Sequence, residues 1–496
     1  MRISITVVCG GAAQAVLQLV DEELEQQDGE VRVSLKEKRG RINADLTIGA
    51  DVGSAFQLEA NIGLACPGVQ LSGQGFVVPP KAIGFFSDGE SRSLVRPFII
   101  GSDLVQSARG NFVVDATDLN ELQLRNTYPA AYQWLSTRVM PDRSQNPREA
   151  YRKFWWKFSE PRLRFRPALA NLSRAIGTCR TAKHRLFMFL PEGAVCETTV
   201  VTIALEDAAL LGVLSSTVHL VWSAASGGTL EDRPRYQHQR TFNPFPFPDL
   251  HAAANFGGPL TYRINGPGGD GKPTTIGQSA SEVIRDLSEQ LDAHRKRQQA
   301  AHPELTFTGM YNVLDKLRSG EALNAKERTI HEHGLVSVLR ELHDELDAAV
   351  LAAYGWSDLA PLMRVAHGND PPTNGQTREE AARAFEEAVL ERLVALNAER
   401  AAEEARGLIR WLRPEFQNRG TETAARQTEM DTGTGEEDEV GEAAVAKVKP
   451  RAWPKDPIEQ VRAVSEVLTA SPTPLALHDI TARFTSRGSW KKRVGP

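Results

Sequence analysis

The stretch LVSVLRELHDELDAAVLAA, residues 335–353, decides the fold class of the second half of the chain. Its apolar residues recur every three or four positions, which places on one helix face Leu335, Leu339, Leu342, Leu346, Ala349 and Ala353. Two further stretches share this spacing: Ile284, Leu287, Leu291 and His294, and later Phe385, Val389, Leu393 and Leu396. Three such faces predict a helical bundle over residues 276–416.

Two helix starts in this bundle are predicted from capping boxes. Thr377 precedes Glu380 by three positions, and Asn324 precedes Glu327 by three. In a capping box each side chain accepts a hydrogen bond from the backbone amide of the other residue, which satisfies amides that a helix start leaves without partners. We therefore expect helices to begin directly after these two cap residues.

Upstream of the bundle the pattern is that of short strands. Apolar runs separated by Gly, Pro and Asp occur at residues 98–100, 112–114 and 200–203. Residues 3–7 and 31–35 alternate apolar and polar side chains, the period of a half-buried strand. The chain is therefore predicted to be α+β, with a mixed α/β domain over residues 51–252 followed by the helical bundle.

Composition predicts the remaining boundaries. Residues 253–275 are rich in Gly and Pro and are predicted to be a linker. Residues 417–452 hold many acids and few large apolar side chains, so we expect a disordered acidic linker. Residues 453–496 contain two short helical patterns around a Pro-containing turn and stop before a core is closed. We expect there a partial, truncated winged-helix-like segment.

The composition also excludes several classes of protein. No apolar run approaches the roughly 20 residues that span a bilayer, so a membrane protein is excluded. Cys9, Cys66, Cys179 and Cys196 lie far apart without a CxxC pair, and no apolar signal segment follows Met1. We therefore expect a cytoplasmic protein without a disulfide framework or a zinc finger.

The net charge of -5 is an average over regions of opposite sign. Residues 418–445 carry a net charge of -6, and the rest of the chain carries +1. Residues 138–185 hold thirteen Lys and Arg against three acids, a net charge of +10. Because nucleic-acid binding depends on local charge density, this basic stretch indicates an anionic partner.

Aromatic side chains are interleaved with the cations of the basic stretch. It contains YRKFWWKF (151–158), then Arg162, Arg164 and Arg166, and then RTAKHR (180–185). Arginine pairs with guanine edges or phosphates, and planar rings stack on bases. The alternative is a solvated face with the two tryptophans in the core. A second basic group, RPRYQHQR (233–240), follows the Gly227-Gly228 turn and favours nucleic acid.

Several long motifs occur in an order typical of one family. They are RPFIIGSDL (96–104), YPAAYQWLSTRVMPDR (128–143), YRKFWWKF (151–158), RTAKHRLFMFL (180–190), LGVLSSTVHLVWSAASGGTL (211–230) and RTFNPFPFPD (240–249). In this order they resemble the target recognition domain of the MmeI-like type IIG restriction-modification enzymes and their adenine methyltransferase relatives. Residues 306–356 resemble the helical region that follows, so the likeness covers most of residues 40–416.

The resemblance implies a module that recognises a specific sequence of double-stranded DNA, within a site-specific adenine-N6 DNA methyltransferase of a restriction-modification or phage-defence system. In this family a methyltransferase domain, with a Gly-rich loop for S-adenosylmethionine and an Asn-Pro-Pro-Tyr/Phe motif, comes first. Here NDPPT (369–373) ends in Thr and is predicted to be a turn, and Cys9-Gly10-Gly11 lacks a second spaced glycine. We expect residues 1–50 to be the last strands of that domain.

The chain is accordingly expected to be a fragment that has no catalytic residues and binds no cofactor itself, S-adenosylmethionine being the cofactor of the complete enzyme. One alternative is a methyltransferase active only by complementation, with a separate catalytic polypeptide docked on residues 1–50. Another is a protein-interaction scaffold, because amphipathic helices bind partners as readily as they pack together.

Two sets of side chains are predicted to contact DNA. The set predicted to read bases flanks a strand and a glycine turn: Arg180, Lys183, His184, Arg185, Arg235, Tyr236 and Arg240. The set predicted to bind phosphates or stack on bases precedes it: Arg143, Arg148, Tyr151, Arg152, Lys153, Trp155 and Lys157.

No metal ligands are predicted. The histidines and acids that come closest to a ligand pattern are His331, Glu332, His333, His343 and Asp344. They lack HExxH spacing, and the first two histidines point to different faces of a helix, which is typical of surface polar residues. The sequence also contains no Gly-x-Ser-x-Gly elbow and no evident nuclease cluster.

Overall fold

The computed structural model describes ten parts of the chain, namely residues 15–25, 31–40, 49–230, 233–250, 261–263, 273–275, 279–372, 375–418, 451–452 and 484–485. Contacts divide the chain into two compact units, residues 1–425 and residues 426–496. The first unit contains the predicted α/β domain and helical bundle, and the α+β fold class is confirmed.

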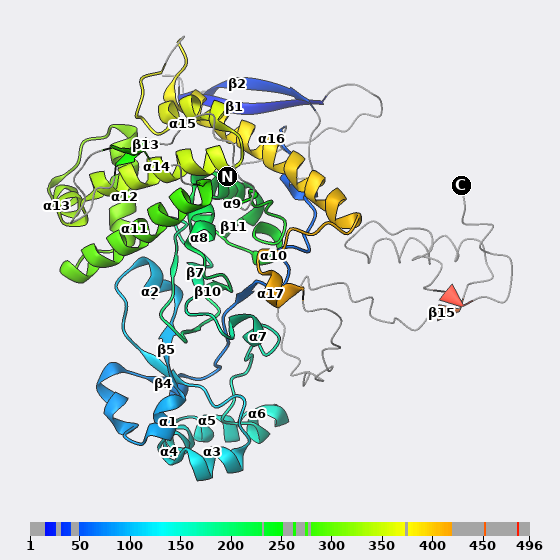
Figure 1. The fold of residues 1–496 in the computed structure, drawn as a ribbon, viewed down its shortest axis with the longest axis vertical. Helices are drawn as coiled ribbons and strands as arrows, with labels where there is room; N and C mark the ends of the chain where they lie inside the picture. Colours follow the sequence, from blue (N-terminus) through cyan, green and yellow to red (C-terminus); the bar gives the residue numbers. More distant parts are fainter. Residues whose placement is uncertain are drawn as a thin grey trace. The chain divides into compact units, whose positions relative to one another are not determined.

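The first lobe of this unit is built on a four-stranded sheet with the order β4-β6-β5-β9. Its strands are β4 (Val77–Val78), β5 (Val95–Ile99), β6 (Phe112–Val114) and β9 (Val195–Cys196). The flanking helices are η2 (Gln74–Phe76), η3 (Pro80–Phe85), α1 (Gly89–Ser93), α2 (Gly101–Val105), α3 (Glu121–Thr127), α4 (Pro129–Arg138), α5 (Met140–Ser144) and α6 (Glu149–Lys153). Phe76, Val113, Trp134 and Trp156 lie in the core that these elements share. Figure 1 shows α1 and α3–α6 gathered at one end of the unit.

A second four-stranded sheet, entirely antiparallel, has the order β3-β10-β7-β8. Its strands are β3 (Ala65–Pro67), β7 (Ile176–Cys179), β8 (Phe187–Phe189) and β10 (Val200–Ile203). Around it lie η1 (Val52–Ser54), α7 (Arg166–Leu169), α8 (Ala208–Ser215), α9 (Thr217–Gly227), β11 (Thr229–Leu230), β12 (Arg233–Pro234) and α10 (His238–Thr241). Every residue of β7, β8 and β10 is buried, which explains why these strands are apolar runs rather than alternating ones.

The predicted helical bundle is present. It comprises α11 (Ala280–Ala301), α12 (Phe307–Ser319), α13 (Ala325–Gly334), α14 (Val336–Ala353), η4 (Ser357–Leu359), α15 (Ala360–Ala366), α16 (Arg378–Ala405) and α17 (Pro414–Gln417). Both predicted capping boxes form, at Asn324 and at Thr377. One position of the predicted apolar face is wrong: Leu335 has a φ of 44° and is 47% exposed. The chain turns sharply there between α13 and α14, so Leu335 precedes the helix instead of facing its core.

The second sheet and the helical bundle share one hydrophobic core. Gly212 of α8 approaches α11 so closely that a Cβ at this position would lie 2.2 Å from the Ser288 hydroxyl oxygen. From α11 the buried Arg295 donates to the backbone carbonyl of Phe187 in β8 at 2.7 Å. The bundle is therefore packed directly on the sheet rather than on itself alone.

The other described strands form pairs. β1 (Ala15–Glu25) and β2 (Val31–Gly40) are antiparallel, and β2 contains the strand predicted at residues 31–35. β13 (Thr261–Arg263) and β14 (Pro273–Thr275) pair within the predicted Gly/Pro linker, and β15 (Arg451–Ala452) pairs with β16 (Phe484–Thr485). The predictions for residues 3–7 and 419–450 fall outside the described residues, and so does the winged-helix-like prediction for residues 453–496 apart from β16.

The structure bears on the expectations about cysteines and membrane-spanning segments only for the described residues. Cys66, Cys179 and Cys196 are free thiols. Within the described parts of the chain, no single helix has the length and apolar character needed to cross a membrane, whereas α8 and α9, bent by 61°, meet those criteria only as a pair.

Candidate nucleic-acid interface

The two segments predicted to read bases lie side by side. Thr181, in the segment between β7 and β8, forms a β-bridge with Arg235, which follows β12. The Tyr236 amide donates to the Arg180 carbonyl at 2.7 Å. Gly227 permits this approach, because a Cβ there would lie 2.2 Å from the Arg235 carbonyl oxygen, and Gly228, at a φ of 68°, turns the chain back. The structure thus brings the glycine turn and the first segment together.

Three arginines from three segments interact electrostatically near this junction, Arg162 with Arg180 and Arg180 with Arg235, and we call Arg162, Arg180 and Arg235 the arginine cluster. Burial lowers the pKa of Arg180, and the charge of Arg162 lowers it further. Burial and then the charge of Arg180 lower the pKa of Arg235. Mutual repulsion among half-buried guanidinium groups favours an anion beside them, because their five-donor planar groups match phosphate and carbonyl acceptors.

A histidine and two acids border the arginine cluster. The pKa of His238 is lowered to about 4 by burial and by the charges of Arg162 and Arg180. His238 is therefore neutral near pH 7 and offers a hydrogen-bonding edge without adding a charge. Glu160 forms an ion pair with Arg162 at 2.8 Å, and the charge of Glu197 raises the pKa of Arg180. The acids offset part of the repulsion within the cluster.

The backbone at Arg162 is in an unusual conformation. Its φ is 55°, an angle that residues other than glycine rarely adopt. Its Nε donates to the Gly68 carbonyl at 3.1 Å. Such conformations persist where the surrounding contacts impose them, and they are frequent at functional sites. Arg162 and His238 were absent from the predicted site residues, although both lie in basic stretches noted in the sequence.

Tyr236 is held inside the fold, which corrects its predicted role as a reader of bases, and the partly buried Arg185 packs against it. Arg185 donates to the carbonyls of Cys179 and Pro234, and its guanidinium lies 5.2 Å from the centre of the Tyr236 ring. Tyr236 is 1% exposed, and its hydroxyl lies 3.1 Å from Nε2 of His219. These contacts join the two segments, and the buried Tyr236 leaves no polar edge for a base, whereas the prediction for Arg185 stays a prediction.

The next two predicted readers contact α12 rather than the arginine cluster. Lys183 Nζ donates to the side-chain carbonyl of Asn312 at 2.6 Å, and Nε2 of His184 lies 2.8 Å from the same oxygen. Nδ1 of His184 lies 3.8 Å from the Asp315 carboxylate. Arg240 is exposed on α10. The predicted set is therefore divided between two places.

In the second predicted set, the rings are part of the core of the first lobe. Tyr151 and Trp155 are 8% and 5% exposed, and the Trp155 indole nitrogen donates to Glu121 at 3.2 Å. Arg143, 3% exposed, donates to the Leu71 carbonyl at 2.7 Å, with its guanidinium 4.6 Å from the Tyr151 ring centre. Their burial corrects the prediction that these three side chains stack on bases or bind phosphates.

The remaining cations of this set lie outside that core. Arg148, Arg152 and Lys153 are exposed, and Nη1 of Arg152 donates to the Asn146 carbonyl at 2.6 Å. Lys157 is half-buried, and burial lowers its pKa while the charge of Asp118 raises it. The interleaved sequence is therefore an amphipathic segment, with rings inward and cations outward, and its cations remain available for phosphates.

The histidines and the NDPPT motif that the sequence analysis set aside have other partners. His343 is buried and bonds the Tyr311 hydroxyl at 2.7 Å, whereas His331 lies on the surface, 3.0 Å from the Ser337 hydroxyl. Asn369, the first residue of the NDPPT motif, donates to Asp344 at 2.9 Å. Residues 369–372 of the motif lie in the connection between α15 and α16, outside any helix.

Comparisons with known proteins concern mainly the part of the chain that carries the arginine cluster. Residues 87–249 match the family model described as MmeI, target recognition domain. A solved structure of the type IIL restriction-modification enzyme MmeI in complex with DNA matches with 15% identity and a TM-score of 0.49. That match covers 79% of this chain and 42% of the other, so the chain spans less than half the length of that enzyme. No curated protein matches the chain.

Proposed function

Because residues 87–249 are an MmeI-type target recognition domain, we propose that this chain recognises a specific sequence in double-stranded DNA. The observation that carries the proposal is the arginine cluster, whose three guanidinium groups come from three segments of that domain. Arginine is the side chain that most often pairs with guanine in the major groove, and it binds phosphates equally well. Arg180 and Arg235 read base edges, and Arg162 supports them from the strained turn.

The exposed cations of the first lobe make the contacts that do not depend on sequence. Arg148, Arg152 and Lys153 bind phosphates, which supplies affinity and sets the orientation of the protein on the duplex. Lys183, which contacts α12, and Arg240, exposed on α10, are further cations of the same domain. This division separates positioning side chains from reading side chains.

We propose further that the module serves a site-specific adenine-N6 methyltransferase of a cytoplasmic restriction-modification or phage-defence system. The methyl donor, S-adenosylmethionine, is bound by a catalytic domain and not by the residues described here. That domain is joined to this chain or supplied as a separate polypeptide, and the two arrangements differ in a simple assay. Methyl transfer to duplex DNA by the chain alone would contradict the proposal, whereas transfer that requires an added catalytic polypeptide would support complementation.

The test of DNA recognition begins with selection of preferred duplexes from a random pool. We expect the selected duplex to bind on the order of a thousandfold more tightly than a shuffled one, with an affinity that falls steeply as salt rises. Arg392→Ala is the matched control, because this arginine pairs with Asp358 at the helical bundle, outside the recognition domain. Equal affinity for selected and shuffled duplexes would contradict sequence recognition, and the absence of any DNA binding would favour the scaffold alternative.

A further inference from the structure

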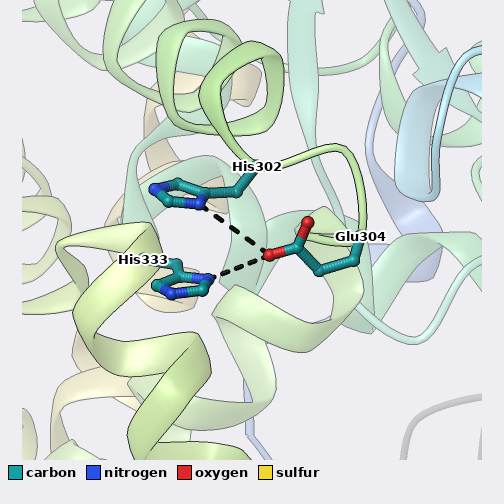
Figure 2. A group of neighbouring side chains, drawn as sticks. All are labelled: His302, Glu304 and His333. Carbon is teal, nitrogen blue, oxygen red and sulfur yellow. Dashed lines mark hydrogen bonds and ion pairs between the residues drawn. The ribbon is translucent and has the colours of Figure 1, made fainter.

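Three potential ligand side chains converge in the helical bundle, away from the arginine cluster. Figure 2 shows the imidazole rings of His302 and His333 stacked, with the carboxylate of Glu304 facing the edges of both. The ring centres are 4.0 Å apart, and the rings are inclined by 13°. One carboxylate oxygen of Glu304 lies 2.9 Å from Nδ1 of His333 and 3.8 Å from Nδ1 of His302. All three ligand atoms lie within 4.8 Å of one another.

The backbone around these side chains is held by contacts of its own. His302 ends α11, where its amide donates to the Gln298 carbonyl at 2.9 Å, and Leu305, three residues on, is 2% exposed. His333 lies in the last turn of α13, and the carbonyl of the next residue, Gly334, accepts from Nε2 of the buried His294 at 3.1 Å. This last bond ties α11 to the end of α13. Backbone contacts of α11 and α13 therefore hold the two histidines close together.

The donor set selects a class of ion. Two imidazole nitrogens and one carboxylate oxygen suit borderline ions such as Zn²⁺, whereas Mg²⁺ and Ca²⁺ prefer oxygen ligands alone. The side chains are 34%, 64% and 36% exposed in the order His302, Glu304 and His333, so water can complete the coordination. We propose that His302, Glu304 and His333 form a binding site for one divalent transition-metal ion, with Zn²⁺ as its representative.

A hydrogen bond to Glu304 satisfies only one of the two imidazole nitrogens, whereas a bound ion could be coordinated by both. Nδ1 of His333 is close enough to donate to the carboxylate, whereas Nδ1 of His302, at 3.8 Å, is beyond hydrogen-bonding distance. Because the lone pairs of two nearly parallel rings do not meet at one point, binding one ion requires these partly exposed rings to turn out of their stacked arrangement.

The ion would strengthen a contact between the bundle and the recognition domain. Between the two ligands of the α11–α12 connection, the Pro303 carbonyl accepts from the Ser107 hydroxyl at 3.1 Å. Gln299, one turn before His302, donates to the carbonyl of Gln106 at 2.7 Å. Both partners directly follow α2, within residues 87–249. The metal therefore acts as a structural clip that joins the ends of α11 and α13 behind this contact.

The test is calorimetric titration of the tag-free full chain with Zn²⁺. We expect one ion per chain, and at least a roughly tenfold loss of affinity in His302→Ala and in His333→Ala. His331→Ala is the matched control, because this exposed histidine lies on the same helix outside the group, and its affinity should stay within about twofold of the native value. Circular dichroism of each variant verifies that the helices remain folded.

Co²⁺ provides a second measurement on the unaltered chain. Coordination by imidazole nitrogen in a four-coordinate site gives visible absorption bands, and Zn²⁺ should displace them. Failure of the native chain to bind Zn²⁺ saturably, or an equal loss of affinity in His331→Ala, would overturn the proposal. Neither result would affect the proposed recognition of DNA, because the site lies outside the arginine cluster.

Discussion

Residues 151–158 and the segments that carry the arginine cluster are both basic in the sequence. Folding places their side chains differently. In the first, cations and rings are neighbours along the chain, and folding separates them into an exposed and a buried side. In the second, Arg162, Arg180 and Arg235 are distant along the chain, and folding brings them together. Charge density along the sequence thus indicates an anionic partner, whereas only the fold shows which cations act together.

The difference has an energetic basis. Burying the rings of the first segment removes apolar area from water and stabilises the lobe, while its cations remain solvated at little cost. Placing Arg180 and Arg235 in the cluster destabilises the fold, because burial and then the charge of a neighbouring arginine lower the pKa of each. Under the proposed function, a bound phosphate or base edge would offset part of this cost.

The largest expected effect is on stability, and it tests whether the rings of residues 151–158 are buried while the cations are solvated. Trp155→Ala should lower the free energy of unfolding by roughly 3–5 kcal/mol, because it removes a large ring from the core of the first lobe. Arg152→Ala, three residues earlier and exposed, should change it by less than about 0.5 kcal/mol. Urea denaturation of both variants measures the difference. Similar losses in the two would contradict the separation into buried rings and solvated cations.

The next effect concerns DNA. Arg180→Ala and Arg235→Ala should each cost roughly 1–3 kcal/mol of binding free energy on the selected duplex and relax the preference at one position. Arg152→Ala should weaken selected and shuffled duplexes alike and lower the salt slope by about one. Binding curves at several salt concentrations distinguish these behaviours. An unchanged preference in both cluster variants would refute the assignment of Arg180 and Arg235 as base readers.

The smallest expected effect is a dependence of stability on pH, which arises from His238 beside the arginine cluster. The folded pKa of His238, about 4, lies below the usual value of an unfolded histidine, so the unfolded chain binds its proton first as pH falls. The stability that neutral His238 contributes is therefore present above the unfolded pKa and is lost as pH falls toward the folded one. Between about pH 7 and about pH 5.5 this loss should amount to roughly 1 kcal/mol.

The matched variant for this measurement is His238→Gln, which cannot titrate in that range. Urea denaturation at both pH values should give the native chain an acid loss larger by about 1 kcal/mol than that of the variant. The difference between the two chains removes the contributions of other histidines. An identical loss in both would show that His238 is solvated rather than held neutral beside the arginines.

The sequence by itself determined the elements whose causes are local. Helical spacing and the capping boxes at Asn324 and Thr377 located the bundle helices, because side chains one turn apart and cap residues act within a few positions. The same reasoning located strands β6 and β10. It failed at Leu335, where a left-handed turn between two helices interrupts a continuous apolar pattern.

Only the tertiary structure decided which side chains face one another. The arginine cluster joins three segments through the strained turn at Arg162 and the glycine turn at Gly227, and no spacing along the chain encodes that meeting. The metal-ligand group pairs a local His302-Pro-Glu304 motif with a histidine from another helix. Local periodicity determines the direction of a side chain relative to its own helix or strand. Long-range packing determines which side chains from other elements lie next to it, and a binding site is formed by side chains from several elements.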